Sequence, residues 1–238
     1  MAEFASRSDE IARALRDDIL RGRYRSGERL PSERALAART AANRGSVREA
    51  LKKLEQQRLI EIRRGGGARV APLNDASPDV LVHLLKLDDP PDPALVGQWI
   101  DVYELVAAGA MRLAVERAND AEIAEVRQLL ARFADPSMGD QEFLRTTDEI
   151  AEVISAASRN LVLRMVRSTL RALFFQRFPS RRVRLRPPPE VLEPITAWLD
   201  QALARRDAPA AEEGVRRLLR SGRESLLKAL EAHAARPA

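Results

Sequence analysis

Apolar positions near the start of the chain recur with helical spacing and predict three short helices. We expect them over residues 8–22, over residues 32–40, and from Asn43 onward. In the third helix, apolar residues recur at i, i+3, i+4 and i+7 between Val47 and Leu54, and most of its arginines and lysines lie outside this stripe. One face of the third helix is therefore expected to be buried and the other to be basic.

The spacing then changes to the alternation of β-strands. Residues 59–63 alternate between apolar and polar side chains, the glycines at 65–67 supply a turn, and residues 69–71 can return as the partner strand. Three helices with a tight turn between the second and the third, followed by a short hairpin, are typical of a winged helix-turn-helix. We expect this domain over residues 1–75.

From about Pro78 the pattern is that of long helices without strands. We expect an all-α helical bundle over residues 76–238, so that the whole chain is mainly α with one small β-hairpin. The predicted helices span residues 78–87, 93–118, 120–134, 140–157, 159–178, 189–205 and 208–234.

Basic residues are concentrated in the predicted winged domain. Residues 1–75 contain 17 Lys and Arg against 11 Asp and Glu, a balance of +6, whereas the other 23 basic and 24 acidic residues balance at −1. Such an asymmetry favours a nucleic acid or another anionic partner. The charge pattern by itself leaves open that this is only a solvated surface.

Several functional classes are excluded by what the sequence lacks. It has no Cys and two His, so disulfides, thiolate metal sites and cysteine nucleophiles are not expected. Without a nucleophile–base pair or a phosphate-binding loop, an enzyme is not expected either. No apolar run approaches the ~18 residues of a membrane-spanning helix, and the first residues show no signal-peptide pattern. We therefore expect a cytoplasmic protein without a membrane partner.

A dense set of fixed spacings lies between Gly22 and Val70. It consists of Gly27, Leu30 to Arg34, Leu36, Ala37, Arg44, Val47 to Leu51, Leu54 and the glycines of the wing. The segment resembles the winged helix-turn-helix of the GntR family of bacterial transcription regulators. The resemblance implies sequence-specific binding to double-stranded DNA, with the N-terminus of the third helix in the major groove.

The resemblance also assigns DNA contacts. Arg44 and Arg48, one helical turn apart, are the predicted base-contacting residues, since Arg can bond guanine at O6 and N7. Arg34, Asn43 and Ser46 are predicted to contact phosphates. The alternatives are structural: an ion pair with a neighbouring glutamate on a solvated face for the arginines, and a helix cap for the asparagine.

The resemblance extends to the wing, and two residues depart from the family pattern. The family places its wing in the minor groove, which assigns Arg64, Gly65 and Gly66 to that contact. Asn43 stands where the family usually has Ser or Thr, and Arg58 where it usually has Gly. Because an arginine disfavours the left-handed region, we expect the backbone at Arg58 to avoid positive φ.

A second set of spacings lies in the predicted bundle. It consists of Leu113, Ala114, Glu116 to Ala118, Asp148 with Ala156 to Ser158 and Asn160, and Ala202, Leu203, Asp207 and Ala211. With the helix order and length, it resembles FCD, the ligand-sensing domain of the FadR branch of the GntR family. Many members of that branch bind a divalent metal through one Asp and three His, and the metal helps to hold a carboxylate effector.

The metal ligands of that branch are largely replaced in this chain. By position, the Asp falls on Asp148 and the three His fall on Glu152, Thr196 and Leu218. Two carboxylates and a hydroxyl are a poor ligand set, so no metal and no other cofactor is expected. The alternative role of the two carboxylates is to line a polar patch or to pair with Arg145, Arg164 or Arg167.

The effector pocket is expected to be apolar. Tyr103 and Ala107 replace a usual Arg and a usual Glu, and the predicted effector-binding residues are Tyr103, Ala107, Asp148, Glu152, Thr196 and Leu218. With Val106, Val153, Phe174 and Trp198 nearby, the effector is expected to be a fatty acyl-CoA or another organic acid. The arginine-rich loop at 177–186 could meet its phosphates, or DNA, or be only solvated.

The function expected from these features is a ligand-responsive homodimeric repressor of metabolic genes. Two-fold symmetry implies a short palindromic operator. The alternative is a ligand-independent regulator with a degenerate pocket, whose operator affinity no metabolite would change.

Overall fold

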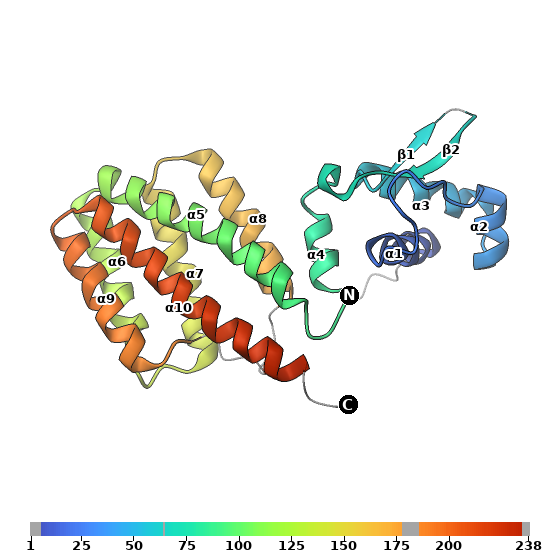
Figure 1. Ribbon diagram of the computed structural model, residues 1–238. Helices are drawn as coiled ribbons and strands as arrows, with labels where there is room; N and C mark the ends of the chain where they lie inside the picture. The colour runs from blue at the N-terminus through green and yellow to red at the C-terminus, as the bar shows by residue number, and fades with distance from the viewer. Residues whose placement is uncertain (1–5, 64, 178–185, 235–238) are drawn as a thin grey trace. The chain divides into compact units, whose positions relative to one another are not determined.

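The computed structural model describes residues 6–63, 65–177 and 186–234, and the chain divides into two compact units, residues 1–89 and 90–238. Figure 1 shows the elements of each unit. The predicted fold class, mainly α with one small hairpin, is confirmed. No helix in the described ranges is long and apolar enough to cross a membrane.

The first unit is a helix-turn-helix with a hairpin. Its elements are α1 (Arg7–Leu20), α2 (Glu33–Thr40), α3 (Arg44–Gln56), β1 (Ile60–Arg63), β2 (Gly67–Val70), a 3-10 turn (Leu73–Asp75) and α4 (Val80–Leu85). Both α1 and α2 pack against α3. The shared core includes Leu15, Leu36, Val47, Leu54, Ile60 and Val70. Val80 is buried in the same core, so α4 packs with this unit.

The two strands form a short antiparallel wing. Ile60 pairs with Val70, and the register continues to Arg63 opposite Gly67. The sequence predicts that the returning strand starts at residue 69, whereas β2 starts at Gly67. The ladder therefore extends to the last of the three glycines, and the turn between the strands is shorter than expected.

The end of α3 is a Schellman motif whose left-handed residue is Arg58. Its φ is +54°, which contradicts the expectation that an arginine at this position avoids positive φ. The N–H of Arg58 donates to the Glu55 carbonyl at 2.9 Å, and the N–H of Leu59 donates to the Leu54 carbonyl at 3.0 Å. Leu54 and Leu59 are both buried. Two hydrogen bonds and an apolar contact thus hold Arg58 in a conformation that favours glycine.

Arg58→Gly should stabilise the first unit by about 1 kcal/mol, because it removes the steric cost of a left-handed L-residue. The measurement is urea unfolding followed by far-UV circular dichroism. Arg58→Ala is the matched control, since it removes the same charge and keeps the steric cost. An alanine variant as stable as the glycine variant would contradict this account of the turn.

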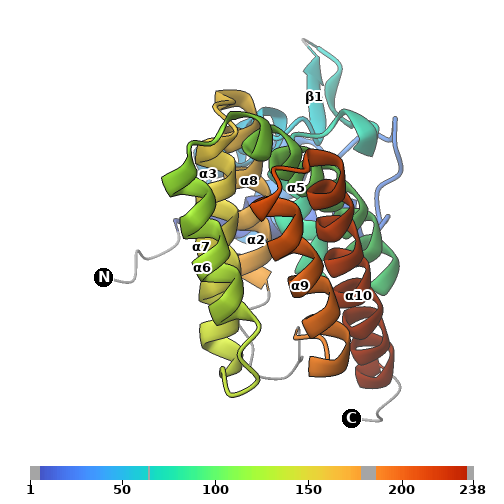
Figure 2. The same ribbon diagram turned by 90° about the vertical axis from the view of Figure 1, so that its left-hand side faces the viewer.

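The described part of the second unit is a helical bundle, whose members run along one another in Figure 2. They are α5 (Pro93–Arg117), α6 (Asp120–Phe133), α7 (Asp140–Ala157), α8 (Leu161–Arg177), α9 (Pro189–Ala204) and α10 (Ala208–Ala234). The ends of these helices lie within two residues of those predicted. α5 packs against α7, α8 and α10, and α6 packs against α7 and α9. The core includes Ala108, Met111, Val126, Leu130, Leu199 and Leu203.

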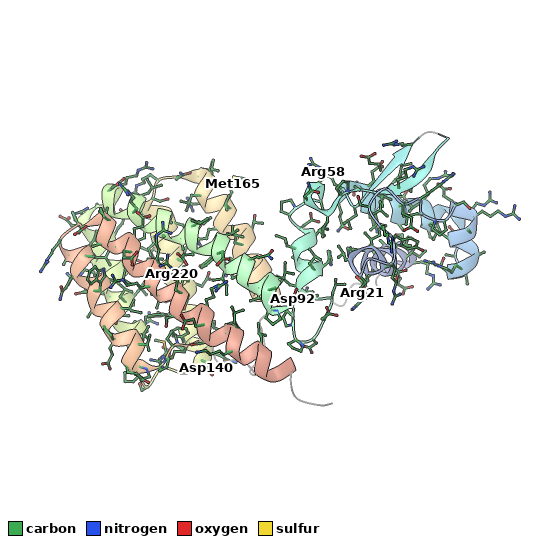
Figure 3. All side chains as sticks on the ribbon, in the orientation of Figure 1. Arg21, Arg58, Asp92, Asp140, Met165 and Arg220 are labelled. Carbon is green, nitrogen blue, oxygen red and sulfur yellow. The ribbon has the colours of Figure 1, made fainter. Side chains whose placement is uncertain are left out.

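A buried carboxylate fastens α5 to α10. Glu104 is 9% exposed, and its Oε1 accepts hydrogen bonds from Nε and Nη2 of Arg220 at 3.2 and 3.1 Å. Nη1 of Arg216 lies 3.6 Å from the same oxygen. Arg220 is labelled on α10 in Figure 3. A buried charge needs such partners, because removing an unpaired ion from water costs several kcal/mol.

Candidate DNA-binding surface and effector cavity

A tight turn sets the start of α3. Ala41 ends α2 in the left-handed region, with φ of +48°. Asn43 then caps α3, because its side-chain oxygen accepts the backbone N–H of Ser46 at 2.8 Å. The cap orients the first turn of α3 and engages the single oxygen of the Asn43 side chain, whose amide group is otherwise exposed. The cap proposed as an alternative role for Asn43 is therefore present, while Ser46 is half-buried beside it.

Arg44 and Arg34 are the least engaged of the predicted DNA contacts. Both side chains are exposed, and neither forms a hydrogen bond or salt bridge with any residue that the structure describes. Arg44 is the first residue of α3, where the helix dipole adds positive potential. A guanidinium in this position is free to contact an anion or the edge of a base.

Arg48 is held by a carboxylate from the preceding helix. Its Nε and Nη2 donate to Oε1 and Oε2 of Glu33 at 3.2 and 3.0 Å, a bidentate pair between α3 and α2. The hydrogen bond from Arg48 lowers the pKa of Glu33, and the Glu33 carboxylate raises the pKa of Arg48. An exposed pair of this kind adds little stability. Its main effect is to fix the direction of the Arg48 side chain.

The tip of the wing is only partly described. Gly65 is exposed with φ of +72°, and Gly66 is half-buried next to it. Arg64 lies outside the described residues. Arg63, on β1, is exposed, and its Nη2 lies 3.0 Å from Oε2 of Glu61. The described tip thus presents backbone without side chains at the two glycines.

The second unit contains a mainly apolar cavity of about 150 Å³ that is partly open to the surface. A second cavity of about 90 Å³ shares with it Tyr103, Phe133, Thr147, Arg167, Leu218 and Leu219. The first cavity has an apolar wall that includes Ile100, Phe133, Phe143, Leu144, Leu219 and Leu226. Its polar groups include Tyr103, Thr147, Asp148, Arg167, Arg171 and Arg223. The three guanidinium groups suit an organic anion with an apolar body, which would compete with the carboxylates that pair with them.

The predicted effector-binding residues divide between the cavities and other places. Tyr103 and Leu218 line both cavities, Asp148 lines the first and Ala107 the second. Glu152 lines neither, and points to arginines of α8 instead. Thr196 also lines neither, since its buried hydroxyl donates within α9, to carbonyl oxygens of the preceding turn. The structure thus brings together four of the six residues.

Arg167 of α8 is the central polar group of the cavities. Its side chain is 8% exposed. Nε donates to Oγ of Ser155 at 3.2 Å, Nη1 lies 3.4 Å from Oδ1 of Asp148, and Nη2 bonds Glu152. Burial raises the pKa of the Tyr103 phenol, and the charge on Asp148 adds to this shift while Arg167 opposes it. The phenol therefore stays protonated at neutral pH and can donate a hydrogen bond to a ligand.

Sequence reasoning missed two cations of the cavity and named the third only as an alternative partner. Arg171 donates from Nε to Oδ1 of Asp148 at 2.6 Å. Nε of Arg223, on α10, lies 3.3 Å from Oδ1 of Asp101. Arg167 and Arg171 stand one turn apart on α8, as Asp148 and Glu152 do on α7. This matched spacing of opposite charges on α7 and α8 is the sequence signal from which the cavity cations of α8 could have been predicted.

The residues at the family's metal position do not suit a metal ion. Asp148 and Glu152 are engaged by arginines, Thr196 bonds its own helix, and Leu218 has no donor atom. Among the residues that the structure describes, no three His, Cys, Asp or Glu side chains gather as a metal site would require. A guanidinium, that of Arg167, binds the two carboxylates instead.

Other residues named for the pocket have different surroundings. Trp198 lines neither cavity, and its Nε1 donates to the Ala210 carbonyl at 2.9 Å. The guanidinium carbon of Arg217 lies 4.6 Å from the centre of the Trp198 ring. Of the arginine-rich loop, Arg186 donates to the Met138 carbonyl at 2.8 Å and to two neighbouring carbonyls. Residues 178–185 of that loop and the side chain of Phe174 lie outside the described part.

Comparison with known proteins gives the same two domains. Residues 7–70 match bacterial regulatory proteins of the gntR family, and residues 98–221 match the FCD domain. The galactonate operon transcriptional repressor of Escherichia coli (strain K12) is 28% identical over 228 residues, which cover 93% of this chain and 97% of the repressor. The transcriptional regulator Mce2R of Mycobacterium tuberculosis (strain CDC 1551 / Oshkosh) is 30% identical over 167 residues, 70% of this chain and 69% of that protein.

A solved structure shares the fold. It is that of Lar, described as controlling the expression of the Listeria monocytogenes agr system, and it matches with a TM-score of 0.51 at 14% identity. The match covers 97% of this chain and 99% of that one. The galactonate operon repressor and Mce2R are regulators of transcription, not enzymes. The chain belongs to the GntR family of bacterial transcription regulators, and it joins a gntR-type DNA-binding domain to an FCD domain.

Proposed function

We propose that the chain is a cytoplasmic homodimeric repressor that binds a short palindromic operator and responds to a small organic anion. The observation that carries the DNA-binding part is the set of exposed arginines at the start of α3 and on α2. The E. coli relative is a repressor of a galactonate operon, and we assign to this chain the same kind of control over a metabolic operon.

In the proposed complex, the N-terminus of α3 enters the major groove. Arg44, unengaged in the described structure, contacts a base, and Arg48 contacts a second base one turn along. Arg34, Asn43 and Ser46 contact phosphates, together with backbone N–H groups at the start of α3. Arg64, Gly65 and Gly66 of the wing approach the minor groove.

The cavity chemistry supports a compact organic acid as effector. Arg167, Arg171 and Arg223 supply positive charge and Tyr103 a hydrogen-bond donor, beside an apolar wall. Cavities of about 150 and 90 Å³ are small against the roughly 300–1,000 Å³ of sites for drug-sized ligands. Between the two classes that the sequence suggested, the volume favours a small organic acid over a fatty acyl-CoA.

The three arginines at the cavity favour a ligand-responsive regulator over one with a degenerate pocket. A ligand changes operator affinity only if it binds the two states of the dimer unequally. An anion that reaches Arg167 or Arg171 competes with Asp148 and Glu152 for them. It therefore acts on the ion pairs that join α7 to α8. A ligand that changes these pairs can bind the two states of the dimer with different affinities.

Arg44→Ala and Arg48→Ala should each weaken binding to the specific operator by roughly 1–3 kcal/mol and relax base preference at one position of each half-site. The physical reason is the loss of a bidentate bond to guanine. The measurement is binding to a randomised operator library, with wild-type affinity on the selected site as reference. Arg13→Ala, an exposed arginine of α1, is the control. Unchanged affinity and preference in both α3 variants would refute the assigned base contacts.

Glu33→Gln should tighten binding to unrelated DNA and lower the ratio of specific to non-specific affinity. The variant releases Arg48 from its bidentate pair, and each added phosphate contact steepens the dependence of log K on log salt by about 0.9. The measurement is a salt titration of binding to operator and random duplexes. Glu10→Gln, which breaks an exposed pair with Arg7 on α1, removes the same charge elsewhere in this unit. If the two variants behave alike, Glu33 does not restrain Arg48.

A screen of small organic acids should find one that raises the melting temperature of the second unit, and Arg167→Met should abolish that shift. Arg217→Met is the control, because Arg217 lies over Trp198 outside the cavity. Arg223→Met removes a second cation of the cavity, and this variant should bind the operator as the wild type does when no ligand is present. A thermal shift that survives both Arg167→Met and Arg223→Met would place the ligand elsewhere. A screen without any shift would support the ligand-independent alternative.

A further inference from the structure

Aromatic side chains are concentrated at the first cavity of the second unit. The chain has two Trp, two Tyr and six Phe, and four of these ten residues line this cavity: Trp99, Tyr103, Phe133 and Phe143. They form two stacked pairs. The ring centres of Trp99 and Tyr103 are 5.2 Å apart with an interplanar angle of 13°, and those of Phe133 and Phe143 are 4.5 Å apart at 25°. Such pairs present ring faces and edges on which a further flat ring can stack.

A glycine inside α10 widens the cavity on one side. Leu218, Leu219, Gly222 and Leu226 have the spacing of one helix face, and all four line the cavity. A Cβ added at Gly222 would meet no atom within 4 Å, so there is open space where a side chain would stand. Because glycine inside a helix is less stable than alanine, this space is kept against the preference of the helix.

The size of the cavity matches a single six-membered ring. Its volume is about 150 Å³, and apolar protein cavities of about this volume admit benzene. The second cavity, of about 90 Å³, shares Tyr103 and Arg167 with the first and offers space for one small substituent. A ring that enters the first cavity leaves water for contact with an apolar wall, which favours its binding.

The cavity also holds cations. Arg167 and Arg171 of α8 and Arg223 of α10 line it together with Asp148, and their ion-pair partners are carboxylates of the chain. The carboxylate of a ligand would replace one of these partners and form the same kind of charge-assisted hydrogen bond. The cavity can therefore satisfy one ring and one acidic group at the same time.

Hydroxyl groups of a ligand would find few acceptors in the cavity. Among the described residues that line it, three side chains carry oxygen: Tyr103, Thr147 and Asp148. The Thr147 hydroxyl donates to the Phe143 carbonyl at 2.7 Å, and Oδ1 of Asp148 accepts from Nε of Arg171 at 2.6 Å. A buried hydroxyl without a hydrogen-bond partner weakens binding. An acid that carries several hydroxyl groups is therefore disfavoured.

We propose that the first cavity binds a compact aromatic carboxylate of about the size of benzoate. The ring of this ligand packs against the aromatic side chains and against Gly222, and its carboxylate pairs with the arginines. The proposal rests on the ligand-responsive regulator of the proposed function, and it narrows the small organic anion to one chemical class.

The ligand class is tested by calorimetric titration of the full-length protein with benzoate, 4-hydroxybenzoate and phenylacetate. The tightest of these should bind about threefold or more tighter than cyclohexanecarboxylate, whose ring has the same charge beside it but cannot stack. It should bind about tenfold or more tighter than gluconate, which has hydroxyl groups instead of a ring.

Equal or tighter binding of cyclohexanecarboxylate or gluconate would overturn the aromatic class and leave a ligand-responsive regulator intact. Absence of binding by all three aromatic acids would also overturn it. The wider screen of organic acids then decides separately whether the protein responds to any ligand.

The site is tested at Gly222. Gly222→Leu should weaken binding of the tightest aromatic acid by about tenfold or more, because its side chain fills the cavity, while the melting temperature without ligand is unchanged or raised. Gly222→Ala should act in the same direction. Gly109→Ala is its matched control, because Gly109 also lies inside a helix with open space at its Cβ and lines neither cavity. Wild-type affinity in Gly222→Leu, or an equal loss in Gly109→Ala, would contradict this site.

Discussion

The second unit is organised around the buried guanidinium of Arg167. A charge that is removed from water must be paired and hydrogen-bonded, and this one uses Ser155, Asp148 and Glu152, all on α7. The pairing fixes α8 against α7 and places a cation in the shared wall of both cavities. Positive charge beside both cavities is thereby supplied by the chain itself, at two carboxylates that include the family's metal-binding Asp position.

Most of the first unit follows from local sequence pattern. The apolar stripe from Val47 to Leu54, the cap at Asn43 and the glycines of the wing specify elements that the structure contains. The error at Arg58 came from applying a residue preference where tertiary contacts decide. The buried Leu54 and Leu59 and two backbone hydrogen bonds close the turn, and the arginine follows them into the left-handed region.

The cavity was less predictable, for a physical reason. Helical spacing identifies which residues share a face, but not how each helix is rotated against its neighbours. Asp148 and Tyr103 were placed by resemblance, whereas Arg223 comes from the last helix and reaches the cavity only because α10 packs along α5. Thr196 shows the converse. Its position in the family pattern suggested a contact with the effector, but its hydroxyl donates to carbonyl oxygens of its own helix.

The bidentate hold of Glu33 on Arg48 bears on the time that a repressor spends searching. A genome offers on the order of 10⁶–10⁹ competing sites, and residence on each of them is set mainly by contacts to phosphate. An arginine kept on a carboxylate of the preceding helix adds little to those residences. In the proposed contact of Arg48 with DNA, guanine O6 and N7 would replace the two carboxylate oxygens of Glu33, and the number of hydrogen bonds would be conserved. Under this proposal, the Glu33–Arg48 pair shortens the time spent at non-specific sites and does not weaken binding at the operator.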